Sequence, residues 1–176
     1  METVFVPKRL LDEARKRGID VESLVVDLLV ERLGIDPRDA VDVHLELATK
    51  FFEEGLELVE KDPVQASEKL YKAMEECVKA VAKLLDLKDV VDRVKARGRW
   101  TVTDLERVVR RASEVIGEEL GIAWDAANYL HVWGFHEAKL SPESVKARAP
   151  SIRRAIELVK NYAEKLLKHG TDSSKD

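Results

Sequence analysis

The stretch that decides the fold is DPVQASEKLYKAMEECVKAVAKLL, residues 62–85. Its apolar side chains recur every three or four residues, the spacing that places them on one face of an α-helix. Asp62 provides an N-cap, and Pro63 follows at the first helical position. The stretch therefore predicts a long amphipathic helix. Its buried face is expected to hold Ala66, Leu70, Ala73, Cys77, Ala80 and Leu84.

Helical spacing of apolar residues continues on both sides of this stretch. Asp36-Pro37 repeats the Asp-Pro entry and predicts a preceding helix joined to the first by a short turn. Pro150 is expected to kink or restart the last helix. The sequence thus predicts an all-α fold, an antiparallel bundle of about five helices within residues 36–169. The helices are expected over 37–60, 62–86, 101 or 103 to 117, about 122–139, and from 141 onward.

Residues 1–35 are interpreted as a separate appendage. Extended-type side chains at 3–6, stopped by Pro7, predict a short strand, and two short helices follow. This order resembles the ribbon-helix-helix DNA-binding fold, in which paired strands from a dimer lie in the major groove. Positions 2–6 read ETVFV and lack the basic residues expected to contact base edges. We therefore expect dimerisation or packing by this segment rather than DNA binding.

Two polar segments are harder to assign to helices. Residues 87–100, LKDVVDRVKARGRW, hold the densest basic cluster of the chain. We interpret them as a solvated connection that Trp100 anchors to the core, and a phosphate-facing loop is the alternative. Residues 170–176, GTDSSKD, are polar and predict a disordered tail.

Composition narrows the classes of protein. Cys77 is the only cysteine, which excludes an internal disulfide and a cysteine-based zinc cluster. A net charge of -4 argues against nonspecific nucleic-acid binding driven by total charge, although a local basic patch is compatible with it. No apolar run reaches the roughly 18 residues that span a bilayer, and the first residues carry charge where a signal peptide is apolar. We expect a soluble cytoplasmic protein. Its many charged residues and few side-chain amides resemble proteins from hot environments.

The stretch LHVWGFHE, residues 130–137, places two histidines five positions apart. On an ideal α-helix, at about 100° per residue, His131 and His136 point about 140° apart. Gly134 lies between them and can relax the helix, which would bring the rings closer. If both face a cleft, one histidine can act as general base on a ribose 2'-hydroxyl and the other as acid to the leaving oxygen.

Two other interpretations of this pair remain open. In the first, His131 hydrogen-bonds within an aromatic core, and His136 lies at an interface beside Glu137 or another carboxylate. In the second, the two histidines and Glu137 bind a metal ion. Helical pairs usually chelate from positions i and i+4, so we expect neither a metal nor another cofactor.

The segments DPVQASEKLYKAMEECVKAVAKLL and HVWGFHEAKLSPESVKARAPSIRRAIELV together resemble the HEPN domains, an all-helical superfamily. The resemblance covers residues 38–167, and LHVWGFHE is similar to the pattern shared by the archaeal PaREP family. HEPN ribonucleases carry an arginine five or six positions before a histidine. Two protomers bring these residues together and cut RNA without a metal. The resemblance implies an RNA-interacting protein of a defence or toxin–antitoxin system.

The motif's histidine falls on His136, which Glu137 follows, and its arginine falls on His131 or Leu130. Arginine is expected to hold the phosphate with a permanently charged fork. Its replacement predicts weak or lost ribonuclease activity, so whether the chain is an enzyme stays open. Residues expected to supply phosphate-binding charge instead are Arg107, Arg111 and Lys139.

The resemblance also implies a homodimer, because HEPN-like bundles place the motif helix at the subunit contact. The residues expected at this interface are Trp124, Asn128, Trp133 and Phe135. The alternative function is a noncatalytic helical module that binds a protein partner, such as the nucleotidyltransferase-like proteins that other HEPN members bind.

Overall fold

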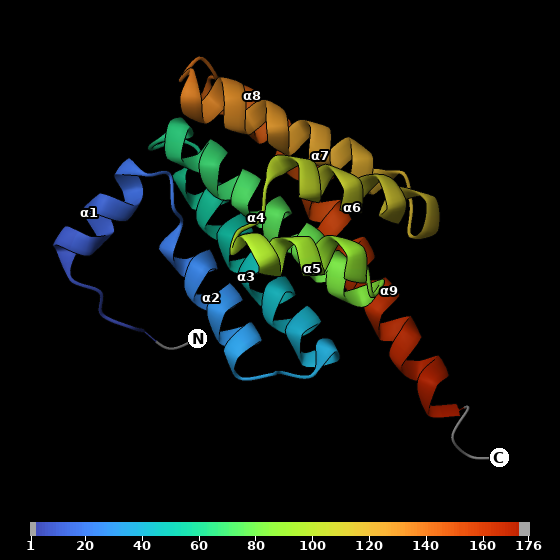
Figure 1. Cartoon of the computed structure of the whole chain (residues 1–176). Helices are drawn as coiled ribbons and strands as arrows, with labels where there is room; N and C mark the ends of the chain where they lie inside the picture. Colours follow the sequence, from blue (N-terminus) through green and yellow to red (C-terminus); the bar gives the residue numbers. More distant parts are fainter. Residues whose placement is uncertain (1–2, 173–176) are drawn as a thin grey trace. The chain divides into compact units, whose positions relative to one another are not determined.

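A computed structural model describes residues 3–172, with side chains placed for residues 3–166 (Figure 1). The chain forms two units, Met1–Asp36 and Pro37–Asp176. The described residues contain helices and no strand, which confirms the predicted all-α class. None of the helices in this part of the chain has both the length and the apolar composition needed to cross a membrane. The elements are α1 (Lys8–Lys16), α2 (Val21–Arg32), α3 (Pro37–Leu58), α4 (Pro63–Leu84), α5 (Lys88–Arg97), α6 (Val102–Val115), α7 (Glu119–Tyr129), η1 (Leu130–His136), α8 (Pro142–Lys146) and α9 (Ala149–Asp172).

The N-terminal unit contains α1 and α2, the two short helices that the sequence predicts. The carboxylate of Asp20 caps α2 by accepting a hydrogen bond from the Ser23 N–H at 2.8 Å. The strand predicted before these helices is not found, because residues 3–7 have no regular secondary structure. An isolated extended segment gains no ladder hydrogen bonds without a neighbouring strand.

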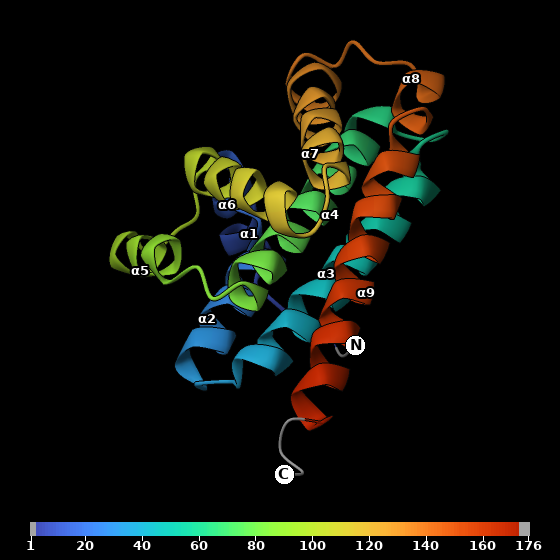
Figure 2. The same ribbon diagram turned by 90° about the vertical axis from the view of Figure 1, so that its right-hand side faces the viewer.

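Helix α4 lies at the centre of the second unit, in contact with α3, α6, α7, η1 and α9 (Figure 2). The Asp62 carboxylate accepts a hydrogen bond from the Gln65 N–H at 3.0 Å, so the predicted N-cap is confirmed. Gly55 allows α3 to approach, since a β-carbon there would stand 2.9 Å from Leu70 Cγ. Of the predicted face, Leu84 is half-buried, and the other members are buried: Ala66, Leu70, Ala73, Cys77 and Ala80.

Residues 88–97 form the helix α5, where the sequence indicated a solvated connection. Val90 and Val94 are buried and attach this helix to the rest of the unit. Two of its arginines already have carboxylate partners: Arg93 with Asp89, and Arg97 with Asp104. Asp104 is buried, so the charge of Arg97 is engaged within the chain, whereas the exposed pair of Arg93 with Asp89 is weak.

The last helices begin where the sequence places caps and prolines. Thr101 caps α6 in a reciprocal capping box, at the earlier of the two predicted starts of this helix. Pro150 lies in the first turn of α9, so it restarts the helix after the short α8. Helix α9 continues to Asp172. The disordered tail that the sequence indicates for residues 170–176 stays a prediction. Positions 173–176 lie outside the described residues.

A polar cluster of His44, Glu76 and Lys79 is buried in the core between α3 and α4. His44 Nδ1 donates to Glu76 Oε2 at 2.8 Å, and Lys79 Nζ donates to Glu76 Oε1 at 2.8 Å. Burial alone raises the pKa of Glu76, but these two donors and their charge outweigh burial and lower it to about 2. The carboxylate therefore stays ionised in the folded chain and holds α3 to α4.

Glu76→Gln is expected to destabilise the folded chain by about 3 kcal/mol at neutral pH, because Lys79 then loses its 2.8 Å ion pair with a fully buried carboxylate. The lowered pKa of Glu76 adds a pH dependence. Its contribution is complete above the ordinary pKa of 4.5 and is lost as the pH falls toward about 2. Urea denaturation from pH 6 down to about pH 2.5 would measure both effects, with the exposed Glu57→Gln as the control. If the free energy of unfolding falls with pH as steeply in Glu76→Gln as in the wild type, Glu76 does not have the lowered pKa.

Candidate functional site

The two histidines of LHVWGFHE lie on a π-helical turn, η1, that continues directly from α7. The Glu137 N–H donates to the Val132 carbonyl, five residues back, at 2.9 Å. A π turn hydrogen-bonds from i to i+5, so residues five apart lie on the same side of the helix. His131 and His136 therefore share a face, and the separation expected for an ideal α-helix does not hold here.

Close packing against α4 accompanies this turn. A β-carbon at Gly134 would stand 2.1 Å from Ser67 Oγ and 2.5 Å from Ser67 Cβ, distances that no real side chain tolerates. The Ser67 hydroxyl turns back along its own helix and donates to the Pro63 carbonyl at 2.7 Å. Glycine at 134 thus lets the η1 backbone rest directly on α4, and this contact brings the histidines next to α4.

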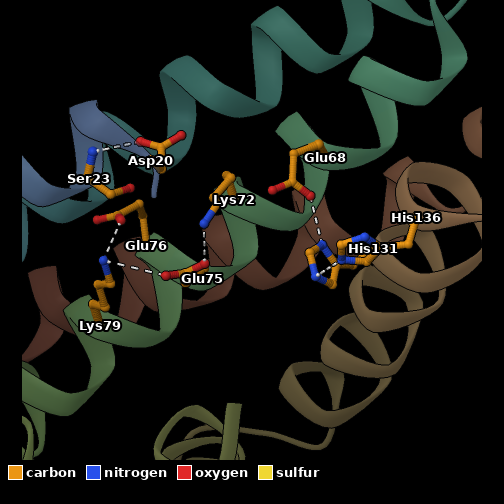
Figure 3. A network of polar contacts seen from close by, with 9 residues as sticks. All are labelled: Asp20, Ser23, Glu68, Lys72, Glu75, Glu76, Lys79, His131 and His136. Carbon is orange, nitrogen blue, oxygen red and sulfur yellow. Dashed lines mark hydrogen bonds and ion pairs between the residues drawn. The ribbon is translucent and has the colours of Figure 1, made fainter. Parts of the chain in front are cut away.

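Glu68 on α4 orients the first histidine (Figure 3). His131 Nδ1 donates to Glu68 Oε2 at 2.7 Å, and both side chains are about one-fifth exposed. A carboxylate only accepts hydrogen bonds, so the proton of a neutral His131 lies on Nδ1. Nε2 of His131 is then left with a lone pair.

The second histidine approaches this lone pair. His136 Nε2 lies 3.1 Å from His131 Nε2, with the two rings nearly perpendicular at 79°. With the His131 proton on Nδ1, the N–H at His136 Nε2 donates to the lone pair of His131 Nε2. Because His136 is exposed, the chain Glu68–His131–His136 leads from a half-buried carboxylate to solvent.

Aromatic side chains fix the plane of the His131 ring. Tyr71 on α4 stacks on it, with centroids 4.1 Å apart, and Phe135 lies 6.0 Å away. Burial and the negative charges of Glu75 and Glu68 raise the pKa of Tyr71 above its usual value. Its phenol therefore remains neutral and acts as a packing surface for the imidazole.

Residues 43–156 match the archaeal PaREP1/PaREP8 family, a span that contains α4 and η1 with all members of the site. The chain belongs to this family. The membership predicted from LHVWGFHE is thus confirmed.

Two solved structures are similar to this PaREP1/PaREP8 protein. A crystal structure of a Sulfolobus solfataricus protein is 36% identical, with a TM-score of 0.60, and the match covers 65% of this chain and 93% of that one. A solution structure of the same structural-genomics target is also 36% identical, with a TM-score of 0.57, and covers 65% of this chain and 88% of that one. No curated protein matches the chain.

The three residues predicted to bind phosphate lie in different settings. Arg107 and Arg111 are on α6, and Arg111 donates to both carboxylate oxygens of Asp89, at 2.7 and 2.9 Å. Lys139 follows η1, where it pairs with Glu137 at 3.1 Å and lies 5.3 Å from the Trp133 ring. Of the three, Lys139 is the nearest in sequence to His136. Its ion pair with Glu137 is exposed and weak enough to exchange partners.

The four residues predicted at a dimer interface divide between core and surface. Trp124 is only 1% exposed, and its indole N–H donates to Glu106, so within one chain this ring belongs to the core. Asn128 and Phe135 are half-buried, whereas Trp133 is 41% exposed. Of this set, Trp133 offers the largest surface to a second molecule.

Sequence reasoning missed Glu68 and Tyr71, the α4 residues that hold His131. Both lie within the stretch that predicts the central helix, but neither belongs to the predicted buried face. The one available signal was Gly134. It lies between the two histidines in the middle of a helical segment, where glycine can relax the helix.

Gly134→Ala is expected to destabilise the chain by about 1–3 kcal/mol, because the added methyl overlaps Ser67 and the turn must shift. Gly121→Ala in α7 is the matched control, since its β-carbon would make an ordinary 3.5 Å contact with Ser113 Oγ. Alanine there should leave stability unchanged or raise it by up to about 1 kcal/mol. Urea midpoints of both variants measure the difference, and equal stability of the two would contradict this packing.

Proposed function

We propose that this protein binds RNA beside His131 and His136 and cleaves it slowly without a metal ion, as in a HEPN-type defence or toxin–antitoxin protein. The observation that carries the proposal is the hydrogen-bonded chain Glu68–His131–His136. It contains two imidazoles in contact, one of them oriented by a carboxylate. General acid–base cleavage of RNA requires two such groups, one as the base and one as the acid.

In the proposed reaction, an imidazole Nε2 takes the proton from a ribose 2'-hydroxyl, and the resulting oxygen attacks the adjacent phosphorus. The bond from phosphorus to the 5'-oxygen breaks, and the second imidazole gives that oxygen its proton. The products are a 2',3'-cyclic phosphate and a 5'-hydroxyl. Because His136 is exposed, its ring can turn outward to admit the phosphate between the two histidines.

The proposed rate is low because no arginine is present at position 130 or 131. A guanidinium would place two permanent N–H donors on the phosphate oxygens. Here that charge comes from a protonated imidazole and from Lys139, which lies in an exposed ion pair with Glu137. Arg107 on α6 is a further candidate contact for the extended RNA.

Cleavage of a mixed-sequence RNA in EDTA is expected to fall about 100-fold or more in His136→Ala, because one proton-transfer group is removed. Glu68→Gln should also reduce cleavage, since His131 loses its orienting carboxylate. The matched control is Glu75→Gln, which makes the same charge change on α4 but whose ion pairs are with Lys72 and Lys79.

The readout is the appearance of cyclic-phosphate ends in RNA treated with identically purified proteins at elevated temperature. Cleavage of equal rate in wild type and His136→Ala, or no cleavage by any of them, would overturn the ribonuclease proposal.

A second candidate function is a noncatalytic dimeric module that binds a protein partner, such as a nucleotidyltransferase-like protein. The observation that favours it is an exposed apolar surface at the α7–η1 junction, which we call the Trp133 surface. It consists of Tyr129, Val132 and Trp133, exposed by 41%, 45% and 41%. Apolar side chains gathered at one place on a surface commonly mark an interface.

If the Trp133 surface joins two copies, the wild-type protein should be a dimer at micromolar concentration, and Trp133→Glu should be a monomer. Val102→Glu changes an exposed apolar residue on another helix and should remain a dimer. Light scattering coupled to size exclusion measures the masses. A wild-type monomer at micromolar concentration would refute the dimer.

A further inference from the structure

We propose that His131 and His136 also form a chelating site for a divalent transition-metal ion of the class that imidazole favours, with Zn²⁺ as the leading candidate. The two ligand atoms are the facing Nε2 nitrogens, and Glu68 orients His131 from behind without touching the ion. This site deepens the proposed function, because the ion would occupy the nitrogens used for cleavage. Its geometry, however, does not depend on cleavage occurring.

The distance between the two nitrogens fits a single ion. With zinc–nitrogen bonds of about 2.0–2.1 Å, a tetrahedral angle places the two ligand nitrogens about 3.3 Å apart. A square-planar angle, which Cu²⁺ and Ni²⁺ prefer, places them about 2.9 Å apart. The separation in this protein is 3.1 Å, between the two values. Rotation of the two rings, so that both lone pairs point to one atom beside the line between the nitrogens, would turn the hydrogen bond into a chelate.

Glu68 supplies the support that histidine ligands ordinarily have. A metal-binding histidine almost always donates its other ring N–H to a carboxylate or carbonyl, which fixes the tautomer and strengthens the ligand. His131 Nδ1 donates in this way to Glu68 Oε2 at 2.7 Å. The stacked Tyr71 ring further holds the imidazole plane. His131 is thus preorganised with its Nε2 lone pair directed at the partner histidine.

The π turn makes a spacing of five residues compatible with chelation by His131 and His136. Helical metal pairs ordinarily use positions i and i+4, because those share one face of an α-helix. In η1, positions i and i+5 share a face instead. The exposed His136 leaves the open side of the pair to solvent, where water can complete the coordination.

The experiment uses the full-length protein without a histidine tag, stripped with EDTA and exchanged into a chelator-free buffer. Zn²⁺ is then titrated against a chromophoric chelator, in the absence of RNA. We expect about one ion bound per chain, binding abolished in His136→Gln, and affinity lowered about tenfold or more in Glu68→Gln. Glu75→Gln should bind as the wild type does. Melting curves of the metal-free variants establish that each is folded.

Two outcomes would overturn the site. One is zinc binding that His136→Gln leaves intact, and the other is a wild type that does not compete with the chelator at all. A separate cleavage assay then connects the site with the proposed function. Zn²⁺ binding without nuclease activity would support the metal site and contradict the proposed ribonuclease. Cleavage without Zn²⁺ binding would support the ribonuclease and contradict the metal site.

Discussion

Direct contact between the η1 backbone and α4 is the constraint on which the site depends. At Gly134 no side chain intervenes, and the Ser67 hydroxyl fills the space that a β-carbon would need. This contact seats the π turn on the central helix and places His131 within 2.7 Å of Glu68. The same turn brings His136 above His131, so one packing contact and one widened turn together produce the three-residue chain.

Much of the fold follows from local signals in the sequence. Capping side chains and prolines indicate where helices start, because they act on backbone groups a few residues away. Asp62-Pro63 and Thr101 are examples. Helix α5 was missed because its dense charge conceals a pattern of only two buried residues, Val90 and Val94. The N-terminal strand was predicted from side-chain type, but strand formation requires a partner that local sequence does not specify.

The site was harder to predict because its geometry is tertiary. An ideal helix separates His131 and His136, and only the i to i+5 bonding of η1 reunites them. Their carboxylate partner, Glu68, lies 63 positions before His131 and occupies a place on α4 that periodicity assigns to solvent. Family resemblance singled out the two histidines as candidates, yet the arrangement of their nitrogens depends on the packing of Gly134 on Ser67.

Nitrogen-15 NMR of the histidine rings tests the central claim most directly. Long-range proton–nitrogen correlations distinguish the two tautomers of each neutral imidazole. The structure predicts that His131 carries its proton on Nδ1, and that His136→Ala shifts the His131 Nε2 resonance while leaving the buried His44 unchanged. A His131 protonated on Nε2, with resonances indifferent to His136→Ala, would contradict the chain from Glu68 to solvent.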